Sequence, residues 1–63
     1  MSLGETIKLR RQTLKTTQQQ LAYVLGVTPQ HISLIEQDKA APSLTILPKL
    51  AEELGVTADY LLT

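Results

Sequence analysis

The sequence lacks several features that small proteins use for stability or chemistry. Its 63 residues include no cysteine, tryptophan or phenylalanine, and aromatic residues make up only 3%. Without cysteine there is neither a disulfide framework nor a cysteine-based zinc site, so an aliphatic core must stabilise a chain near the lower size limit for a domain. No apolar run approaches a membrane span and no signal-peptide pattern opens the chain. We therefore expect a cytoplasmic protein with no membrane partner.

Patterns typical of catalysis and metal binding are also missing. His31 is the only histidine, and Ser33 has no nucleophile-elbow motif around it. No metal-ligand spacing is visible, and so short a chain is too small to enclose a substrate pocket. We expect neither an enzyme nor a metal or cofactor site, and we interpret His31 as a surface residue.

The formal net charge is zero, which argues mildly against nucleic-acid binding. The charges are unevenly distributed, however, since residues 1–39 carry +2 and residues 40–63 carry −2. Few cations are available to neutralise phosphates, so we expect any DNA binding to depend only weakly on salt.

Residues 18–37 hold the pattern around which the chain is organised. Apolar residues at helical spacing predict one helix over residues 18–25 and another over residues 29–36. Gly26 ends the first helix, because a residue that tolerates a positive φ closes a helix at little cost. Thr28 opens the second helix as its N-cap, with a proline at the first helical position. Two short helices joined by a tight turn form a helix-turn-helix.

The outer face of the second of these helices is left for a partner. Ile32 and Ile35 turn toward the first helix. In a DNA-binding helix-turn-helix, the opposite face enters the major groove and reads base edges. The outward residues are Pro29, Gln30, Ser33, Leu34 and Gln37.

A helix is also expected before this pair. Leu3, Ile7 and Leu14 recur at four- and seven-residue spacing and predict a helix from about Leu3 to Leu14. Thr17 is then the expected N-cap of the next helix, with Gln20 completing a capping box.

Two more helices are expected in the second half. The next apolar stripe at helical spacing consists of Leu44, Leu47, Leu50, Ala51 and Leu54. Pro48 interrupts it, and a proline is tolerated only in the first turn of a helix. We therefore expect Thr45 as the N-cap, a start at Ile46 and an end at Gly55. A short helix over 58–62, capped by Thr57, completes the prediction. One core is expected from Leu21, Ala22, Leu25, Val27, Ile32, Ile35, Leu50, Leu54 and Leu61.

The chain resembles the Cro/repressor-type, or XRE-like, helix-turn-helix family of lambdoid phages and bacterial regulators. The residues that carry the resemblance are Ile7, Arg11, Thr17, Gln18, Leu21, Ala22, Leu25, Gly26, Val27, Ile32, Ser33, Ile35, Glu36, Pro42, Ser43, Leu50, Ala51, Leu54, Gly55 and Val56. The resemblance implies an all-α, compact five-helix, lambda-repressor-like domain over residues 1–63, which can be part of a longer regulator. It also implies sequence-specific binding of double-stranded DNA by a transcriptional regulator of the repressor kind.

The resemblance also implies roles for particular positions. Pro29, Gln30, Ser33 and Leu34 are expected to face the bases. We expect phosphate contacts from Arg10, Gln18, Thr28, His31, Gln37 and Lys39. Arg11 and Glu36 are expected to form a partly buried bidentate ion pair behind the reading helix, rather than a loose surface pair.

Three positions depart from the family pattern. Pro29 replaces a polar side chain and excludes hydrogen-bonded readout there, and Leu34 offers only an apolar contact, such as to a thymine methyl. Asp38 replaces a frequent glycine in a left-handed turn and adds a negative charge near phosphate.

Two function classes therefore stay open. One is the DNA-binding regulator, which implies a homodimer on a two-fold symmetric operator, with Tyr60, Leu61 and Leu62 as candidate dimer contacts. The other is a protein-interaction domain that keeps the helix-turn-helix scaffold but no longer binds DNA. The zero net charge, Pro29 and Leu34 favour the second class, whereas the basic first half, Gln18 and Gln30 favour the first.

Overall fold

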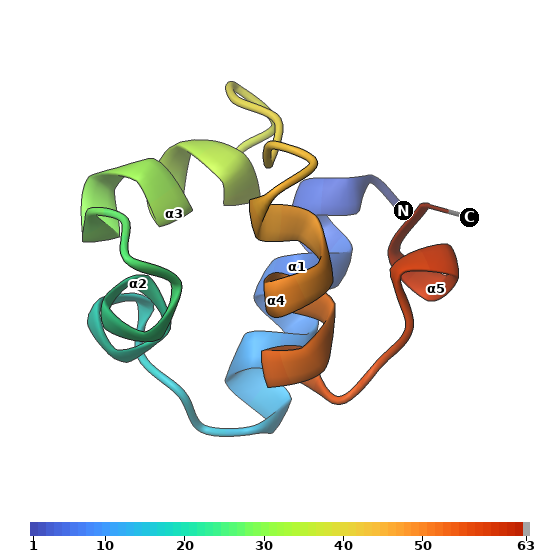
Figure 1. The fold of residues 1–63 in the computed structure, drawn as a ribbon, viewed down its shortest axis with the longest axis horizontal. Coiled ribbons are helices and arrows are strands. Elements are labelled where there is room, and N and C mark those ends of the chain that lie inside the picture. The colour runs from blue at the N-terminus through green and yellow to red at the C-terminus, as the bar shows by residue number, and fades with distance from the viewer. Residues whose placement is uncertain (63) are drawn as a thin grey trace.

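The computed structural model describes residues 1–62, which fold into five α-helices (Figure 1). No strand occurs in this range, so the all-α prediction is confirmed. The helices are α1 (Leu3–Thr13), α2 (Gln18–Leu25), α3 (Pro29–Glu36), α4 (Ile46–Leu54) and α5 (Ala58–Leu62).

The helices surround one aliphatic core. In Figure 1, α1 and α4 lie in the middle with α2 on one side and α5 on the other, and α3 lies along the edge above α2. Ile7, Leu21, Ile32, Ile35, Leu50 and Leu54 are the large side chains with almost no exposed surface. The predicted core is confirmed except at Val27, which is only partly buried and packs against its edge.

Side-chain caps define where the helices begin. Thr17 Oγ1 accepts a hydrogen bond from the Gln20 amide at 3.0 Å, and Gln20 Oε1 accepts one from the Thr17 amide at 2.8 Å, which confirms the capping box. Thr28 Oγ1 accepts from the His31 amide at 3.1 Å. These contacts satisfy N–H groups that the first turn of a helix leaves unpaired.

The end of α1 differs from the prediction. The helix stops at Thr13, and Leu14 is its C-cap with 44% of its surface exposed. Lys15 then adopts a left-handed conformation with φ +57°, which turns the chain toward α2. Leu14 therefore follows the last helical turn, off the buried stripe that the sequence spacing predicts.

The start of α4 also differs. Thr45 makes no side-chain cap, because its backbone already has helical angles (φ −73°, ψ −38°). Ser43 takes that role, since its Oγ accepts from the Ile46 amide at 3.2 Å. Leu44, which sequence spacing places in the buried stripe, lies in this turn and is 87% exposed. The helix itself begins at Ile46 as predicted, with Pro48 in its first turn.

Among the helices of residues 1–62, none has both the length and the apolar character that crossing a bilayer requires.

Candidate nucleic-acid interface

Helix α3 has a buried side and an exposed side. Ile32, Ile35 and Glu36 are buried against the rest of the fold. On the opposite side, Pro29 and Gln30 are exposed. Ser33 and Leu34, nearer the helix centre, are half-buried. Because α3 lies at the edge of the molecule, its outer face is open to a large partner (Figure 1).

Two polar side chains on the outer face of α3 are hydrogen-bonded to each other. Gln37 Nε2 donates to Ser33 Oγ at 2.8 Å, across one helical turn. This bond fixes the Gln37 amide and leaves its carbonyl oxygen and second hydrogen for another partner. Sequence reasoning missed this contact, although the four-residue spacing of two polar residues on a helix permits it.

The predicted ion pair behind α3 is present. Arg11 Nε donates to Glu36 Oε2 at 2.6 Å, and Arg11 Nη2 donates to Glu36 Oε1 at 3.1 Å. Arg11 Nη1 also donates to the Thr16 carbonyl at 2.8 Å. Only 10% of the Arg11 side chain and 3% of the Glu36 side chain are exposed. The pair is bidentate as expected, and it is more deeply buried than the partly buried pair that we expected. The pair joins α1, the α1–α2 turn and α3 in one network.

Gln18 belongs to the same network. Its Nε2 donates to Glu36 Oε1 at 3.0 Å, and the residue is half-buried. The expectation that this side chain is free to reach a phosphate therefore needs correction, because part of its amide is already engaged. Of the backbone N–H groups in the first turn of α2, that of Gln20 is capped by Thr17 Oγ1. A helix leaves the earlier ones without intrahelical partners, and they favour an anion placed there.

Arg10 has a different position from the one expected. Its Nε and Nη2 donate to the Leu54 carbonyl at 3.3 and 2.9 Å. Leu54 is the last residue of α4, so the guanidinium satisfies a carbonyl that the helix end leaves unpaired. The Arg10 guanidinium is thus engaged within the protein, at the end of α4.

The turn after α3 contains two charged residues, Asp38 and Lys39. Lys39 is exposed, and its amide donates to the Leu34 carbonyl at 2.9 Å. Asp38 adopts φ +62°, which confirms the left-handed turn. Hydrogen bonds from the Ser2 side chain and from the Gly4 amide hold the pKa of the Asp38 carboxyl below its usual value.

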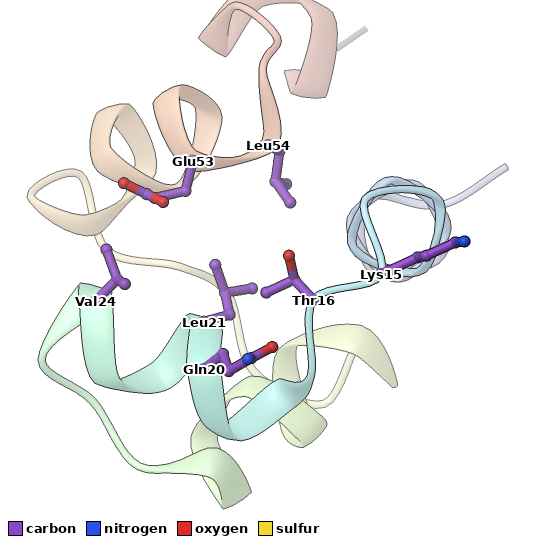
Figure 2. A pocket seen from close by; sticks show the side chains of 7 residues that line it. All are labelled: Lys15, Thr16, Gln20, Leu21, Val24, Glu53 and Leu54. Carbon is purple, nitrogen blue, oxygen red and sulfur yellow. The ribbon is translucent and has the colours of Figure 1, made fainter.

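The fold also has a shallow hollow away from the outer face of α3. It has a volume of about 310 Å³ and lies between α2, α4 and the turn that precedes α2 (Figure 2). Lys15 and Glu53 are its ionisable residues, and Lys15 extends away from the other lining side chains in Figure 2. Within residues 1–62, no group of three or more His, Cys, Asp and Glu residues could hold a metal ion.

Known proteins share this arrangement of helices. The model of the helix-turn-helix family matches residues 7–61. The chain is 42% identical over 59 residues to the SPbeta prophage-derived uncharacterized HTH-type transcriptional regulator YonR of Bacillus subtilis (strain 168), covering 94% of this chain and 55% of the regulator. It superimposes on the P22 c2 repressor, solved with a synthetic operator, with a TM-score of 0.93 and 34% identity over 97% of this chain and 92% of the other.

Fold and sequence therefore define a small all-α domain of the type found in DNA-binding regulators. The chain belongs to the helix-turn-helix family, in its Cro/repressor, or XRE, type.

The domain also occurs in longer proteins. The chain spans about half the length of the curated relatives it matches, for example 55% of YonR. It also superimposes on part of the hydroxypropylphosphonic acid epoxidase of S. wedmorenis, with a TM-score of 0.84 and 32% identity over 94% of this chain and 31% of the epoxidase. One fold can thus serve chains of different activity, so function has to be argued from the site.

Proposed function

We propose that this domain binds double-stranded DNA in a sequence-specific way, as the DNA-binding part of a transcriptional regulator of the repressor kind. The observation that carries the proposal is the two-sided construction of α3. Its inner side is fixed by apolar packing and by the buried pair of Arg11 with Glu36. Its outer side presents uncharged hydrogen-bonding groups at the edge of the fold, as a helix that enters the major groove must.

Base contacts would come from the outer side of α3. Gln30 can make a bidentate contact with adenine, and Ser33 can donate to or accept from a base edge. Pro29 and Leu34 supply apolar contact, for example with a thymine methyl. Specificity would therefore depend on few hydrogen bonds and on shape.

Phosphate contacts would surround this helix. The candidates are Gln18, Thr28, His31, Gln37 and Lys39, without Arg10. The oxygen of Thr28 accepts from the His31 amide, so its hydroxyl hydrogen is the group left for a phosphate. Lys39 is the one lysine or arginine in this set, so the salt dependence should be shallow.

Assembly on DNA would follow a two-fold symmetric operator. We propose that the isolated domain is monomeric or weakly dimeric and that two copies bind half-sites about one helical turn apart. Leu61 is buried in the core, so Tyr60 and Leu62 are the exposed apolar residues left at this end for a dimer contact. Sedimentation at low micromolar concentration tests the proposed oligomeric state, since a tight dimer without DNA would contradict it.

The site of action would be the cytoplasm, where bacterial and phage operators lie.

Selection of bound duplexes from a random DNA pool tests the proposed function directly. We expect enrichment of one pseudo-symmetric sequence and a weaker, salt-dependent affinity for random duplex. Absence of measurable binding to any duplex at low salt would contradict the proposal. That result would instead favour a protein-interaction domain on the same scaffold.

A further inference from the structure

The first turn of α1 contacts the turn that follows α3. The Gly4 amide donates to Asp38 Oδ1 at 2.9 Å, across 34 positions of the sequence. A methyl group at position 4 would lie 2.5 Å from the Ile35 carbonyl oxygen, 2.6 Å from that of Glu36 and 2.7 Å from Asp38 Oδ1. Such distances are too short for a real side chain, so this approach of the two helices requires glycine.

The carboxylate is well suited to its position. The first-turn N–H groups of a helix lack intrahelical partners and carry the positive end of the helix dipole. Asp38 satisfies the Gly4 amide at this place, and the nearby Ser2 side chain also lowers the pKa of the carboxyl. Both contacts favour the charged form of the carboxyl. The carboxylate thus stays ionised and is held by a hydrogen bond within the protein.

The backbone of this turn shows why the side chain matters. Asp38 has φ +62°, a conformation that glycine adopts with less strain. Aspartate is tolerated there, but it improves on glycine only if its carboxylate makes a contact that glycine cannot. The Gly4 amide provides that contact.

The same turn positions Lys39. The Asp38 amide donates to the Ile35 carbonyl at 3.1 Å, and the Lys39 amide donates to the Leu34 carbonyl at 2.9 Å. These bonds tie the turn to α3 on one side, and the Asp38 carboxylate ties it to α1 on the other. The Lys39 side chain therefore extends from a turn that is anchored to both α1 and α3.

We propose that Asp38 is a positioning residue for DNA binding, which anchors the turn after α3 to the start of α1 and so holds Lys39 in place for a phosphate. The inference depends on the proposed DNA-binding function. It reverses the simple electrostatic expectation, by which removal of an acidic residue near phosphate strengthens binding.

A double-mutant cycle on DNA binding tests the inference. The probe is a duplex of random sequence, because phosphate contacts do not depend on sequence. Lys39→Gln should weaken binding and lower the slope of log affinity against log salt by about 1. Asp38→Gly should weaken binding and reduce the slope in the same direction, and it should have little further effect when Lys39 is already replaced. Asp38→Gly is chosen because it relieves the strain of the positive φ, so the variant is expected to fold.

Two controls separate positioning from charge and from stability. Asp38→Asn keeps an acceptor oxygen and a residue tolerant of the left-handed turn, so it should retain most of the wild-type affinity. Glu52→Gln removes an exposed negative charge on α4 and should leave binding unchanged or slightly tighter. All titrations are made at a temperature where circular dichroism shows each variant to be folded.

The outcomes distinguish the two proposals. Unchanged or tighter binding by Asp38→Gly, or effects of Asp38 and Lys39 that simply add, would overturn the positioning role while the wild type still binds DNA. If the wild type binds no duplex, the proposed function fails and this inference fails with it.

Discussion

The two sides of α3 differ in where their partners lie. The inner side contacts only residues of this chain, and Ile32, Ile35 and Glu36 are all buried there. On the outer side, a side-chain hydrogen bond joins Gln37 to Ser33, and the exposed surface increases toward the start of the helix, at Gln30. The inner side therefore has one geometry that burial and hydrogen bonding impose. In the proposed function, the outer side contacts DNA instead.

This difference separates stability from recognition within one short helix. A change on the inner side should alter the free energy of unfolding, because it exposes or leaves unpaired a buried group. A change on the outer side should alter DNA binding with little effect on stability. Substitutions on each side of α3 test this separation when the free energy of unfolding and the DNA affinity are both measured.

The largest effect is expected at the buried ion pair. Arg11→Met or Glu36→Gln should each lower the free energy of unfolding by roughly 3–5 kcal/mol, because each leaves a buried partner uncompensated. Arg11→Lys should not fully restore stability, since an ammonium cannot make two parallel hydrogen bonds. Urea unfolding measures these values.

Matched variants sharpen this test. Replacing both partners by packed apolar residues should recover much of the loss. Arg10→Met, one position earlier, removes only half-buried contacts to the Leu54 carbonyl and should cost about 1–2 kcal/mol. A coupling energy near zero between positions 11 and 36 would contradict the buried-pair interpretation.

The next effect concerns the core against which α3 packs. Leu50 is 1% exposed, and Leu50→Ala should lower the free energy of unfolding by roughly 2–5 kcal/mol, enough to unfold a domain this small. Leu44→Ala is the control, because that side chain is 87% exposed and its loss should change stability by less than about 0.5 kcal/mol. Equal effects of the two substitutions in thermal unfolding would show that the assigned core is wrong.

The same contrast explains which features were predictable from sequence. The five helices and nearly all core residues follow from apolar spacing, caps and glycine positions, because each of these signals is local. Leu14 and Leu44 were misplaced for one reason: each lies just outside its helix, one residue after Thr13 and two residues before Ile46, where the helical period no longer applies. Apolar spacing alone does not mark the residue at which a helix stops.

The tertiary partners of polar residues were harder to predict. Arg10 and Arg11 are neighbours of the same type, but one binds the end of α4 and the other binds Glu36. The contact of Gln18 with Glu36 and that of Gly4 with Asp38 depend on how helices approach each other. Sequence spacing within one helix contains no information on that approach. Only the Arg11–Glu36 pair was foreseen, and family resemblance pointed to it.

A smaller effect is expected on the outer side of α3. Gln30→Ala should lose roughly 1–3 kcal/mol of binding free energy on the selected duplex and relax preference at one base pair. Stability should be nearly unchanged, because Gln30 is exposed. Binding to variant duplexes measures the preference. If all duplexes are weakened equally, Gln30 positions the helix and does not read a base.

The smallest effect concerns the pH dependence of stability at the α1–α3 contact. Hydrogen bonds from Ser2 and Gly4 lower the pKa of the Asp38 carboxyl in the folded state. The unfolded state then binds a proton more readily, so the contribution of Asp38 to stability is present above its unfolded pKa of about 3.9. It is lost as the pH falls below this value through the folded pKa. Asp38→Asn cannot titrate at this position, whereas all other carboxyls titrate in both proteins. The difference in free energy of unfolding between the wild type and Asp38→Asn should therefore decrease as the pH is lowered from 5 to 2 in urea titrations. A difference that stays constant over this range would show that the Asp38 charge contributes nothing to the contact.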